Sequence, residues 1–139
     1  MSIARATMEK RLGNIESSKK AYLKAKSIYR EIQQNEGIAI ALIGLGSIKV
    51  LQQLDSTAEF SEAMEVVVHG QFPNVDAKLD LELGKVATKN GDFEPSNKFF
   101  EKAIIGFEKT DNKSGIALTL MSLATLNRTQ ENISNAKNK

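Results

Sequence analysis

Hydrophobic positions along the chain return every three or four residues, and short turn-forming segments interrupt them at helix-length intervals. This spacing is typical of amphipathic helices, and no segment has the alternation of a strand. The pattern predicts helices over residues 2–12, 15–34, 37–53, 57–68, 75–89, 94–109 and 113–130. We therefore expect an all-α fold of about seven helices, with a frayed tail over residues 131–139, where only Ile133 and Ala136 are apolar.

The predicted breaks contain residues that end or start helices. Gly13-Asn14 has the Gly and Asn expected just past a helix end, and residues 69–74 form an irregular connection punctuated by Gly, Pro and Asn. Pro95 lies where a first-turn proline is tolerated, and Asp55 to Thr57 supply N-cap chemistry. The remaining breaks are expected at residues 35–37, 90–92 and 111–112.

One apolar segment occurs twice. Residues 37–51, GIAIALIGLGSIKVL, return in weaker form as GIALTLMSLATL at residues 115–126, and the alignment also pairs Tyr29 with Phe107. A fixed period of this kind indicates a repeat architecture. Only Ser47 and Lys49 carry polar side chains in the first copy, so that helix must be covered on several sides. We expect it in the middle of an array.

Two parts of the sequence resemble the tetratricopeptide repeat, a helix-turn-helix unit of about 34 residues. The first is Gly13-Asn14-Ile15-Glu16 with residues 21–25, AYLKA. The second is Leu83-Gly84 with residues 91–94, GDFE, and 99–103, FFEKA. The resemblance implies a single domain over residues 1–130, a right-handed superhelical array of antiparallel hairpins. Its units would cover about residues 1–35, 36–72, 73–112 and, in part, 113–130.

Small residues recur where such an array brings helices together. Gly46 and Gly84, with Ala124 as a third member, are expected where two antiparallel helices approach closely. Ala25, Ala63 and Ala103 recur at intervals of 38 and 40 residues, where large side chains would force helices apart. This period exceeds the family norm and resembles its longer-helix variants, which occur in regulatory and scaffolding proteins.

Composition narrows the class of protein. The 139 residues are 41% hydrophobic and 26% charged, the net charge is +2, and there is no cysteine. We therefore expect no disulfide framework, and no partner is demanded by charge alone. There is neither an apolar run of membrane-spanning length nor the order of a secretory signal, so a cytoplasmic protein without a membrane partner is expected.

Candidate chemistry is sparse, and we expect no enzyme, cofactor or metal. Gly44-Leu45-Gly46 lacks a third glycine and a preceding strand, so helix packing is the better interpretation than dinucleotide binding. His69 is the only histidine and has no nucleophile motif around it. Asp80 and Glu82 lie among lysines, as surface carboxylates usually do.

The family resemblance implies a concave groove formed by the first helix of each unit. An apolar centre with basic surroundings suits an extended or helical peptide with apolar anchors and acidic flanks. Several apolar members could instead belong to the core. The family can bind a C-terminal carboxylate through a clamp of particular residues on these first helices. Ile40, Ile43 and Ser47 differ from the residues of that clamp. The implied groove residues are Thr7, Lys10, Arg11, Ile40, Ile43, Ser47, Val50, Lys78, Leu81, Lys85, Thr88, Lys89, Met121, Thr125 and Arg128.

Two alternatives remain beside a peptide-binding scaffold. The truncated first unit and the unpaired last helix leave apolar stripes that a second copy could cover. RNA binding through Lys10, Arg11, Lys85, Lys89 and Arg128 has the right charge but lacks interleaved aromatic residues.

Overall fold

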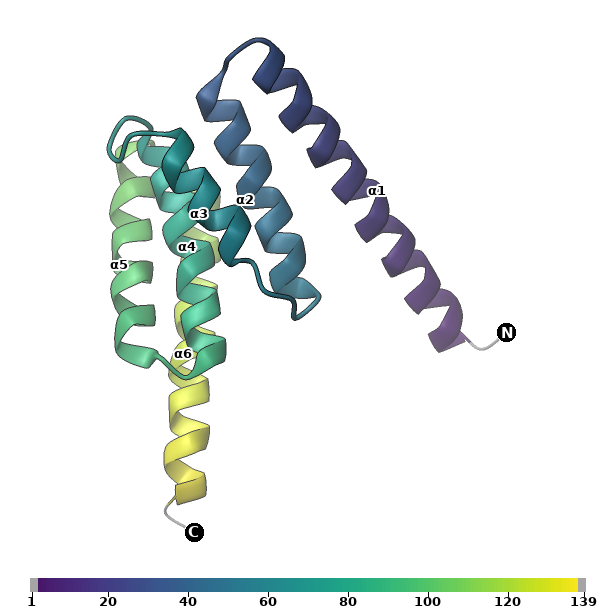
Figure 1. Ribbon diagram of the computed structural model, residues 1–139. Helices are drawn as coiled ribbons and strands as arrows, with labels where there is room; N and C mark the ends of the chain where they lie inside the picture. The colour runs from purple at the N-terminus through teal and green to yellow at the C-terminus, as the bar shows by residue number, and fades with distance from the viewer. Residues whose placement is uncertain (1–2, 138–139) are drawn as a thin grey trace. The chain divides into compact units, whose positions relative to one another are not determined.

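The computed structural model describes the backbone of residues 3–137 and the side chains of residues 12–137. This part of the chain is all-helical and contains six helices and no strand (Figure 1). The helices are α1 (Ile3–Glu31), α2 (Asn35–Leu51), α3 (Thr57–Val66), α4 (Pro73–Asn90), α5 (Phe93–Lys109) and α6 (Lys113–Lys137). The all-α prediction is confirmed.

The predicted break at Gly13-Asn14 is wrong, because α1 runs through it as one helix. A cap-like dipeptide is a local signal, and a glycine inside a helix costs only about 1 kcal/mol relative to alanine. Helix-forming residues on both sides outweigh that cost. Among the described residues there are consequently six helices instead of seven.

Other helix ends differ by a few residues from those expected. The break predicted at residues 35–37 lies just before them, where Gln33 takes a positive φ of 55° and α2 begins at Asn35. The break at Gly91 is confirmed, with a left-handed φ of 81°. Helix α3 ends at Val66 because Val67 is extended, and α6 continues past Gln130, since no Gly or Pro stops it.

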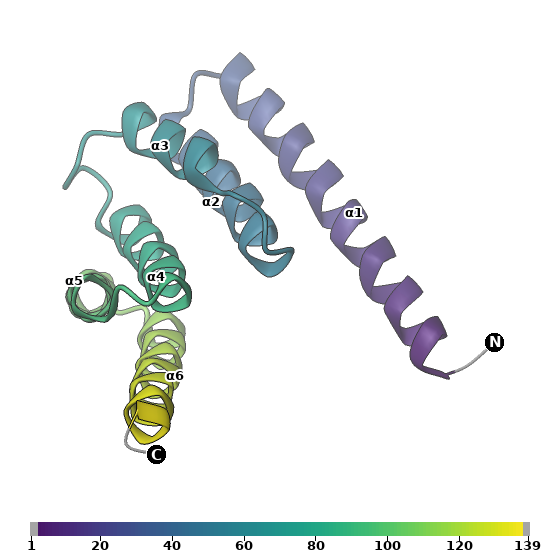
Figure 2. The same cartoon turned by 60° about the horizontal axis from the view of Figure 1, so that its bottom comes forward.

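The chain divides into two compact units, residues 1–68 and 69–139, which meet in the connection expected between residues 69 and 74. In unit 1, α2 packs against both α1 and α3. In unit 2, α4 packs most extensively on α5, and α6 contacts both (Figure 2). Successive helices within each unit run antiparallel (Figure 1).

An aromatic ring lies over a glycine at each of four helix pairs. Tyr29 covers Gly37 between α1 and α2, and Phe60 covers Gly46 between α2 and α3. In unit 2 the corresponding contacts are Phe100 on Gly84, between α4 and α5, and Phe107 on Gly115, between α5 and α6. A β carbon at any of these glycines would overlap the ring. The expected close approach at Gly46 and Gly84 is therefore confirmed.

The core of unit 2 gathers side chains from all three of its helices. Ala103 and Phe100 are fully buried, and Ala77, Leu81, Phe107 and Leu126 complete the cluster. A buried polar contact lies beside it: the Ser96 hydroxyl donates to the Gly84 carbonyl at 2.8 Å, and the Thr88 hydroxyl donates to the same oxygen at 2.9 Å. The Ser96 bond crosses from α5 to α4 and so helps to fix the register of the two helices, whereas the Thr88 bond lies within α4. Neither hydroxyl is left as an unpaired buried donor.

Candidate interaction pocket

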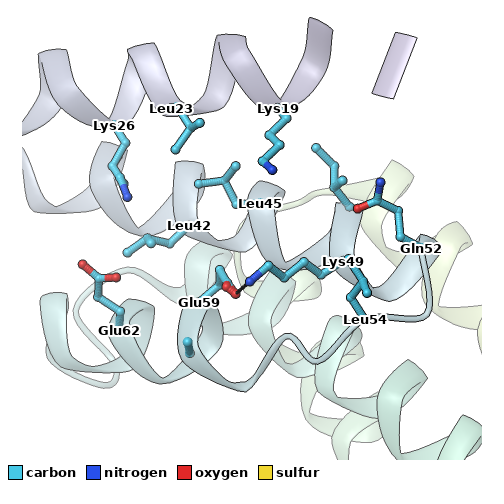
Figure 3. A pocket seen from close by; sticks show the side chains of 12 residues that line it. Lys19, Leu23, Lys26, Leu42, Leu45, Lys49, Gln52, Leu54, Glu59 and Glu62 are labelled. Carbon is cyan, nitrogen blue, oxygen red and sulfur yellow. Dashed lines mark ion pairs between the residues drawn. The ribbon is translucent and has the colours of Figure 1, made fainter. Parts of the chain in front are cut away.

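Unit 1 contains a pocket of about 270 Å³ that is bounded by all three of its helices (Figure 3). Its base is formed by α2, which contributes the buried side chains of Leu42, Leu45 and Ile48. Leu23 of α1 and Leu54, before α3, extend this apolar lining and are 43% and 56% exposed. The pocket therefore offers apolar surface to solvent over a buried base.

Two lysines of α1 reach the pocket from the same face as Leu23. Lys19, Leu23 and Lys26 follow at four- and three-residue steps, so the helix turns them to one side, and all three point into the pocket (Figure 3). Neither lysine takes part in an ion pair with another described residue. Their charges are therefore free to meet a carboxylate from outside.

The acids of the pocket already have partners. Lys49 of α2 lies 2.8 Å from Glu59 Oε1 of α3, and the Glu59 side chain is only 11% exposed. Arg30 of α1 forms an ion pair with Glu62 of α3, which joins the two walls. Because these two carboxylates are neutralised within unit 1, Lys19 and Lys26 determine the charge that the pocket offers to a ligand.

The shape and charge of the pocket suit a few side chains better than a large cofactor. Small-molecule sites usually enclose about 300–1,000 Å³, and this pocket is slightly smaller than that range and open to solvent. Apolar side chains next to a carboxylate would fill the lining and meet the lysines. The described residues contain no group of three His, Asp or Glu side chains that could hold a metal ion.

The residues expected in a concave groove are distributed over both units. In unit 1, Ile43 is 5% exposed, whereas Ile40, Ser47 and Val50 are half-buried. In unit 2, Leu81 is also 5% exposed and belongs to the core cluster. Ile43 and Leu81 therefore offer little surface to a peptide. This agrees with the alternative interpretation that these two residues belong to the core.

Part of the expected groove does come together in unit 2. Lys85 and Thr88 of α4 and Thr125 of α6 line a depression of about 240 Å³, with Phe100 and Ser122. Lys78 is half-buried on α4 and Lys89 is exposed. Met121 and Arg128 are exposed on α6. The side chains of Thr7, Lys10 and Arg11 lie outside the described residues.

The pocket of unit 1 was missed by the sequence-based prediction, because the groove was expected only on the first helix of each unit. A signal was present in the spacing of Lys19, Leu23 and Lys26, which places an apolar residue between two cations on one face. The partners on α3 carried no comparable signal, since their position depends on how α3 packs.

Unit 2 also has an acidic position with altered titration. The pKa of Asp80 is raised from its ordinary 3.8 to about 6, mainly because the carboxyl group is partly buried. Lys102 and His69 act in the opposite direction, and the nearby Asp76 adds to the rise. Asp80 and His69 line a cavity of about 300 Å³ with Lys102. His69 itself is exposed, as expected for a histidine beyond a helix end.

Comparison with known proteins assigns no family. No family model matches the chain, and no curated protein or solved structure matches it significantly. Among the described residues, no helix is both long and apolar enough to cross a membrane.

Proposed function

We propose that this chain is a non-catalytic protein-interaction module of the tetratricopeptide-like kind, with a scaffolding or regulatory role in the cytoplasm. Its ligand is a short peptide segment with apolar side chains next to carboxylates, held in the pocket of unit 1. The observation that carries this proposal is the pair of lysines, Lys19 and Lys26, around Leu23 at the edge of an apolar lining. Apolar burial supplies affinity, and charge complementarity supplies specificity and the rate of association.

The recurring glycine–aromatic contacts support the family assignment. Tyr29 on Gly37 and Phe107 on Gly115 occupy the same places in the two copies of the apolar segment. Phe60 on Gly46 and Phe100 on Gly84 occupy the same places in the two hairpins formed by α2–α3 and α4–α5. Equivalent contacts between successive antiparallel helices are what a helical repeat array requires.

The proposal is tested by selecting ligands from a random peptide library displayed on phage. We expect the selected peptides to be enriched in Leu, Ile or Phe next to Asp or Glu. Fluorescence polarisation with one selected peptide then gives Kd for the protein and for the Lys19→Glu, Lys26→Glu double variant. We expect the double variant to bind about tenfold more weakly or worse, with a weaker salt dependence.

The matched control is the Lys20→Glu, Lys24→Glu double variant. It makes the same charge change on the same helix, but these exposed lysines face away from the pocket. Both variants should keep the wild-type melting temperature within a few degrees, because exposed charges contribute little to stability. Equal loss of affinity in the two double variants would show that general charge, and not the pocket, attracts the peptide.

A second candidate function is self-association, and exposed apolar residues on and just after α1 favour it. Leu12 and Ile28 of α1 are 53% and 48% exposed, Ile32 beyond its end is 61% exposed, and Leu23 adds to the helix. Light scattering over a range of protein concentrations tests it. A monomer at all concentrations would rule out this alternative.

A further inference from the structure

Helix α6 exposes a face whose counterpart on α2 is buried. The alignment of the two apolar segments pairs Leu42 with Leu120 and Gly46 with Ala124. Leu42 is 1% exposed, whereas Leu120 is 53% exposed. Gly46 is buried under Phe60, whereas Ala124 is exposed. Helix α6, which carries the equivalent residues in unit 2, therefore has a face on which no other described residues of that unit pack.

On the side opposite this face, helices α2 and α6 have comparable surroundings. The alignment of the two segments therefore has a structural basis. Tyr29 of α1 covers Gly37 near the start of α2, and Phe107 of α5 covers Gly115 near the start of α6. Farther along, Ile48 and its counterpart Leu126 are both buried. What differs is the next helix: α3 packs on α2, and no further helix among the described residues of unit 2 takes that place on α6.

The chain itself shows which kind of helix covers such a face. Helix α3 places the Phe60 ring on Gly46 and carries the buried Ala63 one turn later. Helix α5 places the Phe100 ring on Gly84 and carries the buried Ala103 one turn later. In both cases an aromatic residue is followed three positions later by alanine, so the helix can approach closely.

Charge adds a second requirement. At the α2–α3 contact, Lys49 near the end of α2 pairs with Glu59, which precedes Phe60. On α6 the cation at the corresponding end of the face is Arg128, which is exposed and forms no ion pair with a described residue, although Glu131 lies one turn farther along. A docking helix therefore gains from a carboxylate next to its aromatic residue.

We propose that the open face of α6, formed by Ala117, Leu120, Ala124 and Arg128, docks an amphipathic helix of a partner protein. That helix carries an aromatic residue followed three positions later by a small one, with an acidic residue beside the aromatic. The ring packs beside Ala124, whose β carbon keeps it farther from α6 than the Phe60 ring is from α2 at Gly46. The small residue limits the separation of the two helices, and the carboxylate pairs with Arg128. This site is separate from the pocket of unit 1 and does not depend on it.

The probe is a synthetic peptide of residues 55–68, DSTAEFSEAMEVVV, made with Ser61→Lys and held helical by a lactam from that lysine to Glu65. The bridge lies on the side away from Phe60 and Ala63, and it overcomes the low helicity of short peptides in water. Titration into the ¹⁵N-labelled protein is followed by NMR. We expect the largest amide shifts at Ala117, Leu120, Met121 and Ala124.

Two leucines of α6 provide a matched pair of variants. Leu120 and Leu118 are 53% and 51% exposed, but only Leu120 lies on the open face, because two residues turn a helix by more than half a circle. We expect Leu120→Glu to weaken binding about tenfold or more, and Leu118→Glu to leave Kd within about twofold. A peptide with Phe60→Ala should also bind at least about tenfold more weakly.

Four outcomes overturn the proposal. They are no binding up to about 1 mM peptide, equal effects of the two leucine variants, shifts centred on α2 instead of α6, and light scattering that shows a dimer which Leu120→Glu dissociates. The last would mean that a second copy covers the face. Melting curves of both leucine variants confirm that each remains folded.

Discussion

The ring of Phe100 occupies the space that a β carbon on Gly84 would need, with its nearest atom 2.5 Å from that position. Phe100 is fully buried in the core of unit 2, so the ring has no room to move aside. Gly84 is therefore required by a neighbour's packing and not by its own backbone conformation.

Replacing Gly84 by Ala should destabilise the protein. Alanine raises helix propensity by about 1 kcal/mol, but overpacking a core contact costs about 1–3 kcal/mol. We expect a net loss of up to about 2 kcal/mol in urea unfolding. Gly13→Ala is the control, because nothing lies within 4 Å of its β position. That variant should gain up to about 1 kcal/mol, and a similar gain at both positions would contradict the packing argument.

Replacing the buried alanines by leucine should also destabilise. Ala63 and Ala103 are 1% and 0% exposed, and each follows a ring that lies on a glycine. Ala103→Leu and Ala63→Leu are each expected to lose about 1–3 kcal/mol by denaturant unfolding. Ala21→Leu, at an exposed position of α1, should change stability by less than about 0.5 kcal/mol. A neutral result at both buried positions would mean that the helices do not need to approach so closely.

Asp80 should make stability depend on pH in a defined direction. Its pKa is about 6 in the folded protein, above the ordinary 3.8, so between these values the folded state holds the proton more tightly. Its contribution to stability is therefore complete below about pH 4 and is lost as the pH rises through about 6. Asp80→Asn should remove this decline when the urea midpoints of both proteins are compared across that range.

Glu131→Gln, at an exposed position of α6, is the control for that comparison. The quantity of interest is the difference between wild type and variant at each pH, because other carboxyl groups titrate in both. A difference for Asp80→Asn that does not change between about pH 4 and pH 6 would contradict the assignment.

Asn112 should stabilise unit 2 by capping α6. Its side-chain oxygen accepts a hydrogen bond from the Gly115 amide at 2.9 Å, and its side-chain nitrogen donates to Asn74 Oδ1 at 2.9 Å. Asn112→Ala is expected to cost about 1 kcal/mol, the usual value for a lost helix cap. Asn74→Ala removes the second bond and a long contact with the Thr110 hydroxyl at 3.5 Å but leaves the cap in place, so it should cost less. The two costs, measured by thermal unfolding, would be equal if the cap contributed nothing.

Helix positions were largely predictable because local residues determine them. Gly91 ends α4 with a left-handed φ, and Pro73 and Pro95 lie in the first turns of α4 and α5. Gly13 shows the limit of local signals. Gly13 and Gly91 are both glycines, but the backbone at Gly13 stays helical, whereas Gly91 has a positive φ and ends a helix. The longer segment around each glycine decides whether the helix continues or ends there.

The candidate pocket was less predictable than the helices. A peptide with apolar anchors and acidic flanks was expected from the charge pattern, and the pocket of unit 1 suits the same chemistry. Its position requires knowing that Lys19 and Lys26 face α2 and that Glu59 and Glu62 are already paired. Those facts depend on contacts between helices, which the spacing within one helix does not contain.

The packing of each helix on its neighbours in the chain has a kinetic consequence. In both units the extensive contacts join successive helices; in addition α6 contacts α4, and the Arg30–Glu62 ion pair joins α1 to α3. Contacts between nearby segments form without closing long loops, and chains rich in such contacts fold in microseconds to milliseconds. The helices of unit 1 can therefore assemble on the ribosome before unit 2 has been synthesised.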